Sequence, residues 1–188
     1  DQTEIVSGTQ IHKIGHSYRT FYMIEFAGIN PENGNPQFYK NDLLEDGSYN
    51  KEITEKASEA KSIMLDKHAE PNITGGLYNS FRYKWFDLSF LFNYQFGGWS
   101  YDTWAQKTEH GGYDMEANIP TYYADSWKKP GDVTKYEQFY EKSSRVAMHK
   151  ITNSRRLHST DFLRLKTFTL GFTLPKQWLS SVGSSNAR

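Results

Sequence analysis

The stretch of sequence that decides the fold is Phe86-Asp87-Leu88-Ser89-Phe90-Leu91-Phe92-Asn93-Tyr94-Gln95-Phe96. Every even-numbered position is apolar or aromatic, and every odd-numbered position except Leu91 is polar. This alternation predicts a β-strand with one apolar and one polar face. Strands of water-soluble proteins usually have about 5–6 residues, whereas a strand that crosses a bilayer needs about 9–11. The pattern therefore fits either the core of a soluble β-sandwich or a membrane-spanning barrel strand.

Two further stretches alternate in the same way. Residues 73–82 form a weaker run that precedes the first one, with Tyr83-Lys84 as a tight connection, so the pair predicts a hairpin. Residues 162–174 predict a third strand, which Pro175 ends. Counted by parity, Arg164 and Lys166 share a face with Phe168 and Leu170 in this strand. If that face meets lipid, we expect the two cations near or above the outer interface, because a charge in mid-bilayer costs about 2–4 kcal/mol.

The rest of the chain contains few periodic elements. Residues 1–70 resemble a loop with scattered short strands, and the Glu- and Lys-rich stretch 51–67 is compatible with a short surface helix. Residues 97–160 form a long polar stretch with repeated Gly and Pro punctuation. Three strands cannot by themselves bury the apolar face that a stable sheet needs to cover. Tight turns that alternate with long loops are typical of an outer-membrane barrel, so we expect an all-β fold of antiparallel strands from a large barrel with long extracellular loops.

Composition excludes several classes of function. The 188 residues carry 22 Lys and Arg against 22 Asp and Glu, so no basic face for nucleic acid is indicated. The absence of Cys removes disulfides, thiolate metal sites and cysteine nucleophiles. His12 and His16 have metal-ligand spacing for a helix, but Gly15 and the extended surroundings argue against a site. No nucleophile motif is present either, so we expect no enzyme activity, no cofactor and no metal.

Motifs in order along nearly the whole chain carry a resemblance to one family. They are Gly15-His16-Ser17-Tyr18 with 26–34, the run 71–90 with Tyr94-Gln95-Phe96-Gly97-Gly98, Asp125-Ser126-Trp127-Lys128-Lys129-Pro130-Gly131-Asp132, and 161–175. On these residues the chain resembles the C-terminal part of SusC-like (RagA-like) TonB-dependent outer-membrane transporters of Bacteroidetes. The last motif is similar to the family's FLRLKxxTLGYTLP, with Phe172 where Tyr is usual.

The resemblance implies a function and a topology. It implies an internal segment of a transporter that imports nutrients, often glycans or oligosaccharides, across the outer membrane together with a SusD-like lipoprotein. Energy would come from TonB acting on a plug region outside these 188 residues. The chain would comprise an extracellular loop (1–70), a transmembrane hairpin (73–96), a second extracellular loop (97–160), a transmembrane strand (161–174) and a periplasmic turn (175–188).

The long polar stretch is rich in aromatic residues that are candidates for substrate or lid contact. They are Trp99, Tyr101, Trp104, Tyr113, Tyr122, Tyr123 and Trp127. Their rings could stack on sugars, or they could pack the loop against itself and form an interfacial girdle, which we favour because so long a loop needs a core of its own. The alternative function is a soluble all-β carbohydrate-binding module. A secreted glycoside hydrolase ranks last. Its paired carboxylates need only meet in space, so the sequence does not exclude them, but no feature of the sequence supports them.

Overall fold

The computed structural model describes residues 4–112, 118–139 and 151–174. These residues belong to two compact units, one formed by residues 1–70 with 99–158 and the other by residues 71–98 with 159–188. The strand pairs of the three larger sheets are antiparallel, and the expected all-β class is confirmed. Within the described ranges, no helix is long and apolar enough to cross a membrane.

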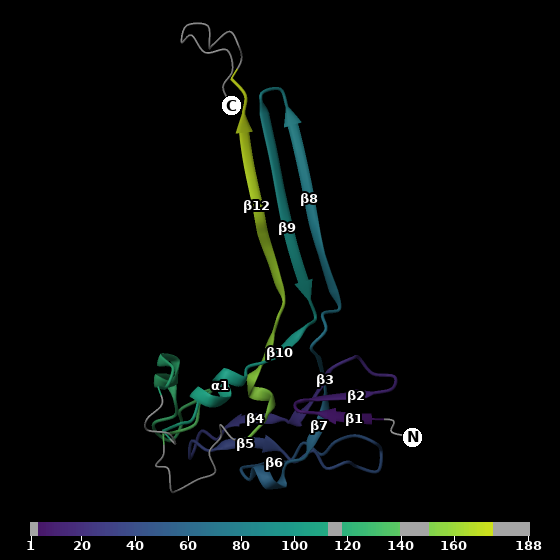
Figure 1. Cartoon of the computed structure of the whole chain (residues 1–188). Coiled ribbons are helices and arrows are strands. Elements are labelled where there is room, and N and C mark those ends of the chain that lie inside the picture. The colour runs from purple at the N-terminus through teal and green to yellow at the C-terminus, as the bar shows by residue number, and fades with distance from the viewer. Residues whose placement is uncertain (1–3, 113–117, 140–150, 175–188) are drawn as a thin grey trace. The chain divides into compact units, whose positions relative to one another are not determined.

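The second unit is built on three strands of 11 residues each, which lie side by side in Figure 1. They are β8 (Ile73–Tyr83), β9 (Phe86–Phe96) and β12 (Phe162–Phe172), in the order β12-β9-β8. Tyr83 pairs with Phe86, so the hairpin turn is Lys84-Trp85, one residue later than the sequence suggested. Lys84 has a positive φ of 52°. The two-residue turns that match the right-handed twist of hairpin strands require a positive φ at their first residue.

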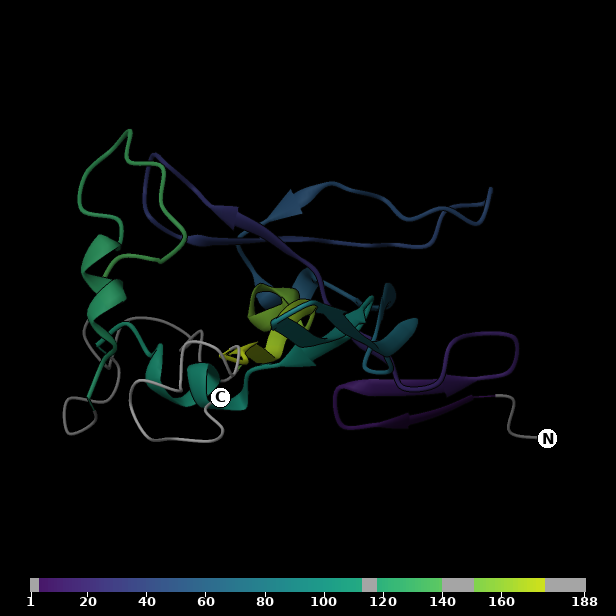
Figure 2. The same ribbon diagram turned by 90° about the horizontal axis from the view of Figure 1, so that it is seen from above.

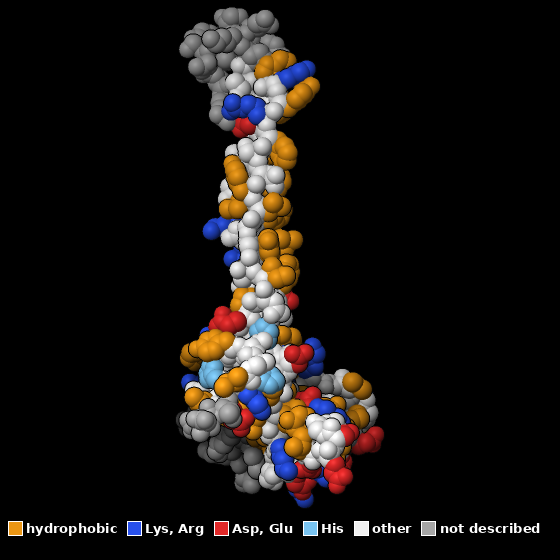
Figure 3. All heavy atoms as spheres, turned by 90° about the vertical axis from the view of Figure 1, so that its right-hand side faces the viewer, with side chains coloured by type: hydrophobic (Ala, Val, Ile, Leu, Met, Phe, Trp, Pro, Cys, Tyr) orange, Lys and Arg blue, Asp and Glu red, His pale blue; other side chains and the backbone are white. Residues whose placement is uncertain are grey.

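The register of these strands gathers the apolar side chains on one face. Residues directly opposite each other in a sheet share a face. The apolar face consists of Ile73, Leu77, Phe81 and Tyr83 of β8, the even-numbered residues 86–96 of β9, and Leu163, Leu165, Phe168, Leu170 and Phe172 of β12. Figure 3 shows hydrophobic side chains gathered mainly along one side of this sheet. Leu163, Phe168 and Leu170 are 61–66% exposed, so this unit leaves a large apolar surface uncovered.

A β-bulge in β12 changes the positions of Arg164 and Lys166 from those that the sequence spacing predicts. The register shifts between Leu165 and Thr167, and Lys166 is the extra residue. Arg164 pairs with Asn93, which places it on the polar face. The expectation that Arg164 shares a face with Phe168 was wrong because one inserted residue reverses the parity of everything before it.

The first unit contains a four-stranded sheet in the order β1-β2-β3-β7. Its strands are β1 (Glu4–Ser7), β2 (Gln10–Lys13), β3 (Thr20–Ile24) and β7 (Ser62–His68). In Figure 2, β1 and β2 form the purple hairpin next to the N-terminus. Phe21 and Met23 of β3 are each 1% exposed and pack with Leu157, Leu65 and Trp99 to form the core of this unit.

The remaining elements of the first unit are short. A three-stranded sheet has the order β4-β5-β6, and β10 pairs with β11. The bounds are β4 (Phe26–Ile29), β5 (Pro36–Tyr39), β6 (Ile53–Thr54), β10 (Trp99–Tyr101), β11 (Leu157–Ser159), α1 (Thr103–Thr108), and the 3₁₀ helices η1 (Ala57–Glu59), η2 (Thr121–Asp125) and η4 (Ser154–Arg156).

One sequence-based expectation for this unit needs correction. Residues 51–67 do not form a surface helix, because β6, η1 and β7 occupy them. β7 forms because β3 offers backbone partners and Ile63 and Leu65 pack toward buried residues, which outweighs the helix propensity of the interleaved Glu and Lys. The described parts of residues 1–70 and 99–158 fold together into one compact unit.

Candidate functional site

The six described candidate aromatics lie in several separate places of the first unit, and Tyr113 lies outside the described residues. Trp99 and Tyr101 stand on β10 and pack against the core of Phe21, Met23 and Leu157. The Lys67 ammonium lies 4.2 Å from the centre of the Trp99 ring, and the Tyr101 hydroxyl donates a hydrogen bond to Gln106 Oε1 at 3.1 Å. These two residues therefore contribute to packing within the unit.

Trp127 holds the turn at residues 30–35. Its indole Nε1 donates to the Pro31 carbonyl at 2.8 Å. A Cβ built on Gly34 would lie 2.6 Å from the ring, and Gly34 has a φ of +69°. Only glycine fits this position, because both the backbone conformation and the close ring exclude a side chain. Trp127 thus joins residues about one hundred positions apart in the sequence.

Tyr122 and Tyr123 meet a third tyrosine that sequence reasoning did not select. The Tyr136 ring centre lies 5.3 Å from that of Tyr122 and 4.9 Å from that of Tyr123. Tyr123 is fully buried, whereas Tyr122 is 44% exposed. Trp104 lies on α1 and is 73% exposed, and the Lys107 ammonium lies 5.1 Å from the centre of its ring. Of the candidates, Trp104 and Tyr122 present accessible rings.

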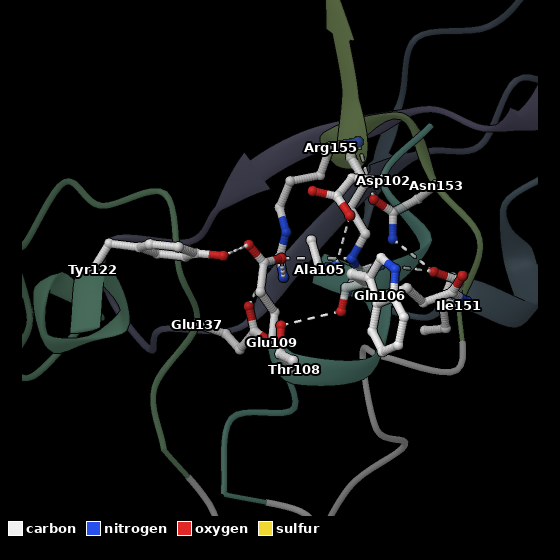
Figure 4. Close-up of polar contacts among 12 residues, drawn as sticks. Asp102, Ala105, Gln106, Thr108, Glu109, Tyr122, Glu137, Ile151, Asn153 and Arg155 are labelled. Atoms are coloured by element: carbon white, nitrogen blue, oxygen red, sulfur yellow. Dashed lines mark hydrogen bonds and ion pairs between the residues drawn. The ribbon is translucent and has the colours of Figure 1, made fainter. Parts of the chain in front are cut away.

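A buried ionic cluster lies beside these tyrosines (Figure 4). Arg155 donates from Nη2 to Glu109 Oε2 at 3.0 Å and from Nη1 to Glu137 Oε2 at 2.5 Å. The side chains of Arg155 and Glu109 are 8% and 7% exposed, and that of Glu137 is 0% exposed. The Tyr122 hydroxyl donates to the other oxygen of Glu109 at 3.1 Å. The guanidinium thus connects two segments that flank the tyrosines.

Local caps fix the positions of the charged residues. Asp102 caps the start of α1 by accepting from the Ala105 amide at 2.8 Å, and Glu109 follows the end of this helix. Asn153, which is fully buried, accepts from the Arg155 amide at 3.0 Å and begins η4. Side chains that accept from free amides at helix starts stabilise those turns, so the cluster is held by rigid local structure.

The environment shifts the pKa values of this cluster. Burial lowers the pKa of the Arg155 guanidinium, but the Glu137 and Glu109 carboxylates outweigh burial and raise it. Burial, reinforced by the Glu109 carboxylate, raises the pKa of Tyr122 to about 12. Arg155 therefore stays cationic and Tyr122 stays a neutral hydrogen-bond donor at any physiological pH.

The cluster borders a cavity of about 420 Å³. Sequence reasoning missed its charged residues Glu109, Glu137, Arg155 and Arg156, because no local motif marks them. The adjacent arginines Arg155-Arg156, in a stretch without acidic neighbours, were the one available signal. Within the described ranges, no group of three or more His, Asp or Glu side chains is placed to hold a metal ion.

Comparison with known proteins finds similarity to a TonB-dependent receptor and to the RagAB transporter. No protein-family model matches the chain. It is 31% identical over 115 residues to TonB-dependent receptor P39 of Formosa agariphila, a match that covers 61% of the chain and 11% of that receptor. Solved structures of the RagAB peptide transporter, and of the RagAB peptide importer in its closed-closed and open-open states, match with TM-scores of 0.69, 0.72 and 0.70.

These structural matches cover 95–98% of the chain at 25–26% identity, and 19–20% of the transporter chains. The chain therefore spans between a tenth and a fifth of the length of the relatives it matches. The matched relatives are a receptor and transporters, not enzymes.

Proposed function

As part of a SusC-like TonB-dependent outer-membrane transporter, this chain is located in the outer membrane, and we propose that it serves the energised import of a nutrient. The observation that carries the proposal is the three-stranded sheet, whose 11-residue strands have one continuous apolar face and one polar face. Such a sheet suits a barrel wall between lipid and an aqueous lumen, where all backbone groups pair within the wall.

The proposed topology follows from the lengths of the connections. The hairpin 73–96 and the strand 161–174 cross the membrane, and the two-residue turn Lys84-Trp85 lies on the periplasmic side. The first unit, from residues 1–70 and 99–158, then lies outside the cell as the folded extracellular region. Residues 175–188, expected as a periplasmic turn, lie outside the described residues.

Partners and substrate belong to the same proposal. A SusD-like lipoprotein would cap the extracellular side, and TonB would supply energy through a plug region. Glycans or oligosaccharides are one substrate class, and the exposed ring of Trp104 suits stacking on a sugar. Peptides are the other class, because the structural relatives are described as peptide transporters.

A soluble carbohydrate-binding module fits the structure less well. Such a module would cover the apolar face of its sheet, yet Leu163, Phe168 and Leu170 stay more than half exposed. Exposed apolar surface of this extent marks contact with lipid or another protein.

Growth on defined nutrients tests the proposed function. A strain that lacks the transporter gene is grown on an oligosaccharide or on a peptide mixture as the limiting nutrient, and is complemented with the wild-type gene. We expect loss of growth on one class, restored by the gene only when TonB is present. Unimpaired growth on both classes, or rescue without TonB, would contradict the proposal.

A further inference from the structure

The cavity beside the ionic cluster combines cationic groups with aromatic walls. It has a volume of about 420 Å³, and Lys135, Arg155, Arg156 and His158 contribute to its lining. Glu109 is the acidic residue in the lining, and Glu137 lies against Arg155 without lining it. The lining thus holds three permanent cations and one carboxylate, and when Glu137 is counted as the partner of Arg155 one net positive charge remains.

The arginines hold unused hydrogen-bond donors. Arg155 Nε and Arg156 Nη2 are buried and have no hydrogen-bond partner within the described part of the chain. Arg156 is 1% exposed and donates from Nη1 to the Ile151 carbonyl at 3.2 Å, while its Nε lies 3.5 Å from Glu109 Oε2. A buried donor without a partner costs free energy, which an additional acceptor would recover.

Aromatic rings fix the orientation of Arg155. Its guanidinium carbon lies 5.5 Å from the centre of the Phe26 ring and 5.7 Å from that of Tyr136. Both residues also line the cavity. A guanidinium held between two rings keeps its position without moving to meet a ligand, and the rings offer apolar surface to the part of a ligand next to an anionic group.

We propose that this cavity binds a carboxylate group of the imported nutrient, with Arg155 and Arg156 as the inner donors and Lys135 at the rim. The inference rests on the proposed function and narrows its substrate to carboxylate-bearing ligands. A planar guanidinium matches a carboxylate in geometry, and Lys135, which is exposed, supplies a mobile positive charge. A carboxylate occurs both in an acidic oligosaccharide and at the C-terminus of a peptide, so the test separates these two sources.

Binding to the transporter, purified from outer membranes in detergent, is measured by calorimetry with two matched pairs of probes. One pair is trigalacturonate and its neutral methyl ester, and the other is N-acetyl-tetra-alanine and its neutral C-terminal amide. We expect one carboxylate probe to bind at least about tenfold more tightly than its neutral partner, as is typical of a charge-assisted hydrogen bond. Preference within the first pair identifies an acidic sugar, and preference within the second identifies a peptide terminus.

Substitution at the rim avoids disturbing the buried cluster. Lys135→Gln should weaken binding of the preferred probe about tenfold, because it removes a charge at the cavity. Lys129→Gln, an exposed lysine of the same region that does not line the cavity, is the matched control and should leave binding unchanged.

The proposal is overturned if neither charged probe is preferred over its neutral partner, or if both lysine variants bind alike. TonB-dependent growth on a nutrient would persist in that case, which distinguishes failure of this inference from failure of the proposed function.

Discussion

Arg164 of β12 lies opposite Asn93 of β9, on the polar face of the three-stranded sheet, although the sequence spacing assigns it to the face of Phe168. The bulge at Lys166 makes this pairing possible, since it lets both Leu165 and Phe168 stay on the apolar face. A regular ladder through the same residues would place the Arg164 charge toward lipid, at a cost of about 2–4 kcal/mol near mid-bilayer.

Single-residue deletions in β12 test whether Lys166 is the extra residue of the bulge. Removing Lys166 leaves Leu165 opposite Phe92 and Thr167 opposite Leu91, so the sheet keeps both faces and we expect normal folding. Removing Thr169 instead shifts Phe168 to the polar face. The folded fraction in outer membranes, measured by heat-modifiable migration in gel electrophoresis, should be near wild type for the first deletion and strongly reduced for the second. Equal loss in both would mean that the bulge is required for another reason.

The contact between Gly34 and Trp127 predicts a difference between two glycine substitutions. Gly34→Ala combines a left-handed backbone with a clash against the indole, so we expect a loss of roughly 2–4 kcal/mol. Gly47→Ala meets open space at a φ of +82° and should lose only the backbone term, about 1–2 kcal/mol. Denaturant midpoints of the purified protein measure both. A Gly34 variant as stable as the Gly47 variant would show that Trp127 moves aside freely.

The buried position of Arg155 predicts a large effect of removing its charge. Arg155→Met removes the ion-pair partner of the buried Glu137 and leaves Glu109 with the 3.5 Å contact to Arg156, which should cost about 3–5 kcal/mol. Lys13→Met breaks the exposed pair with Glu4 and should cost about 0–1 kcal/mol. Thermal unfolding of both variants tests this. Similar small shifts would mean that water reaches the cluster and screens it.

Substitution of Trp104 distinguishes a role of this residue in ligand binding from a role in packing. Its ring is 73% exposed, so Trp104→Ala should leave stability unchanged within about 0.5 kcal/mol. If it stacks on a ligand, affinity for that ligand should fall by an amount typical of an aromatic contact, about 0.5–1.5 kcal/mol. Leu163→Ala, at a similarly exposed position on the apolar face of β12, is a control that should leave affinity unchanged. An unchanged affinity in the Trp104 variant would remove this residue from the list of ligand contacts.

The sequence predicted the strands well where the period is strict. Residues 86–96 alternate at every position except Leu91 and form β9 over the same range. The assignment of β12 residues to faces by odd and even numbering was wrong before the bulge. No sequence feature marks Lys166 as a bulge residue, and only the pairing with β9 reveals it. The helix predicted over residues 51–67 does not form, because pairing of β7 with β3 overrides a weak helix propensity. The Arg155 cluster could not be predicted, since Glu109, Glu137 and Arg155 are far apart in sequence and meet only through folding of the first unit.

The central claim is that β9 separates lipid from a polar lumen, and spin labels along this strand test it most directly. These 188 residues contain no Cys, and any Cys elsewhere in the transporter is first replaced by Ser, so that single labelled cysteines can replace each residue from 87 to 94 in the transporter reconstituted into bilayers. The account predicts that accessibility to oxygen, which concentrates in lipid, peaks at positions 88, 90, 92 and 94, and that accessibility to a water-soluble nickel complex peaks at positions 87, 89 and 93. Uniformly low accessibility to both at the even positions would place them in a protein core and contradict the account.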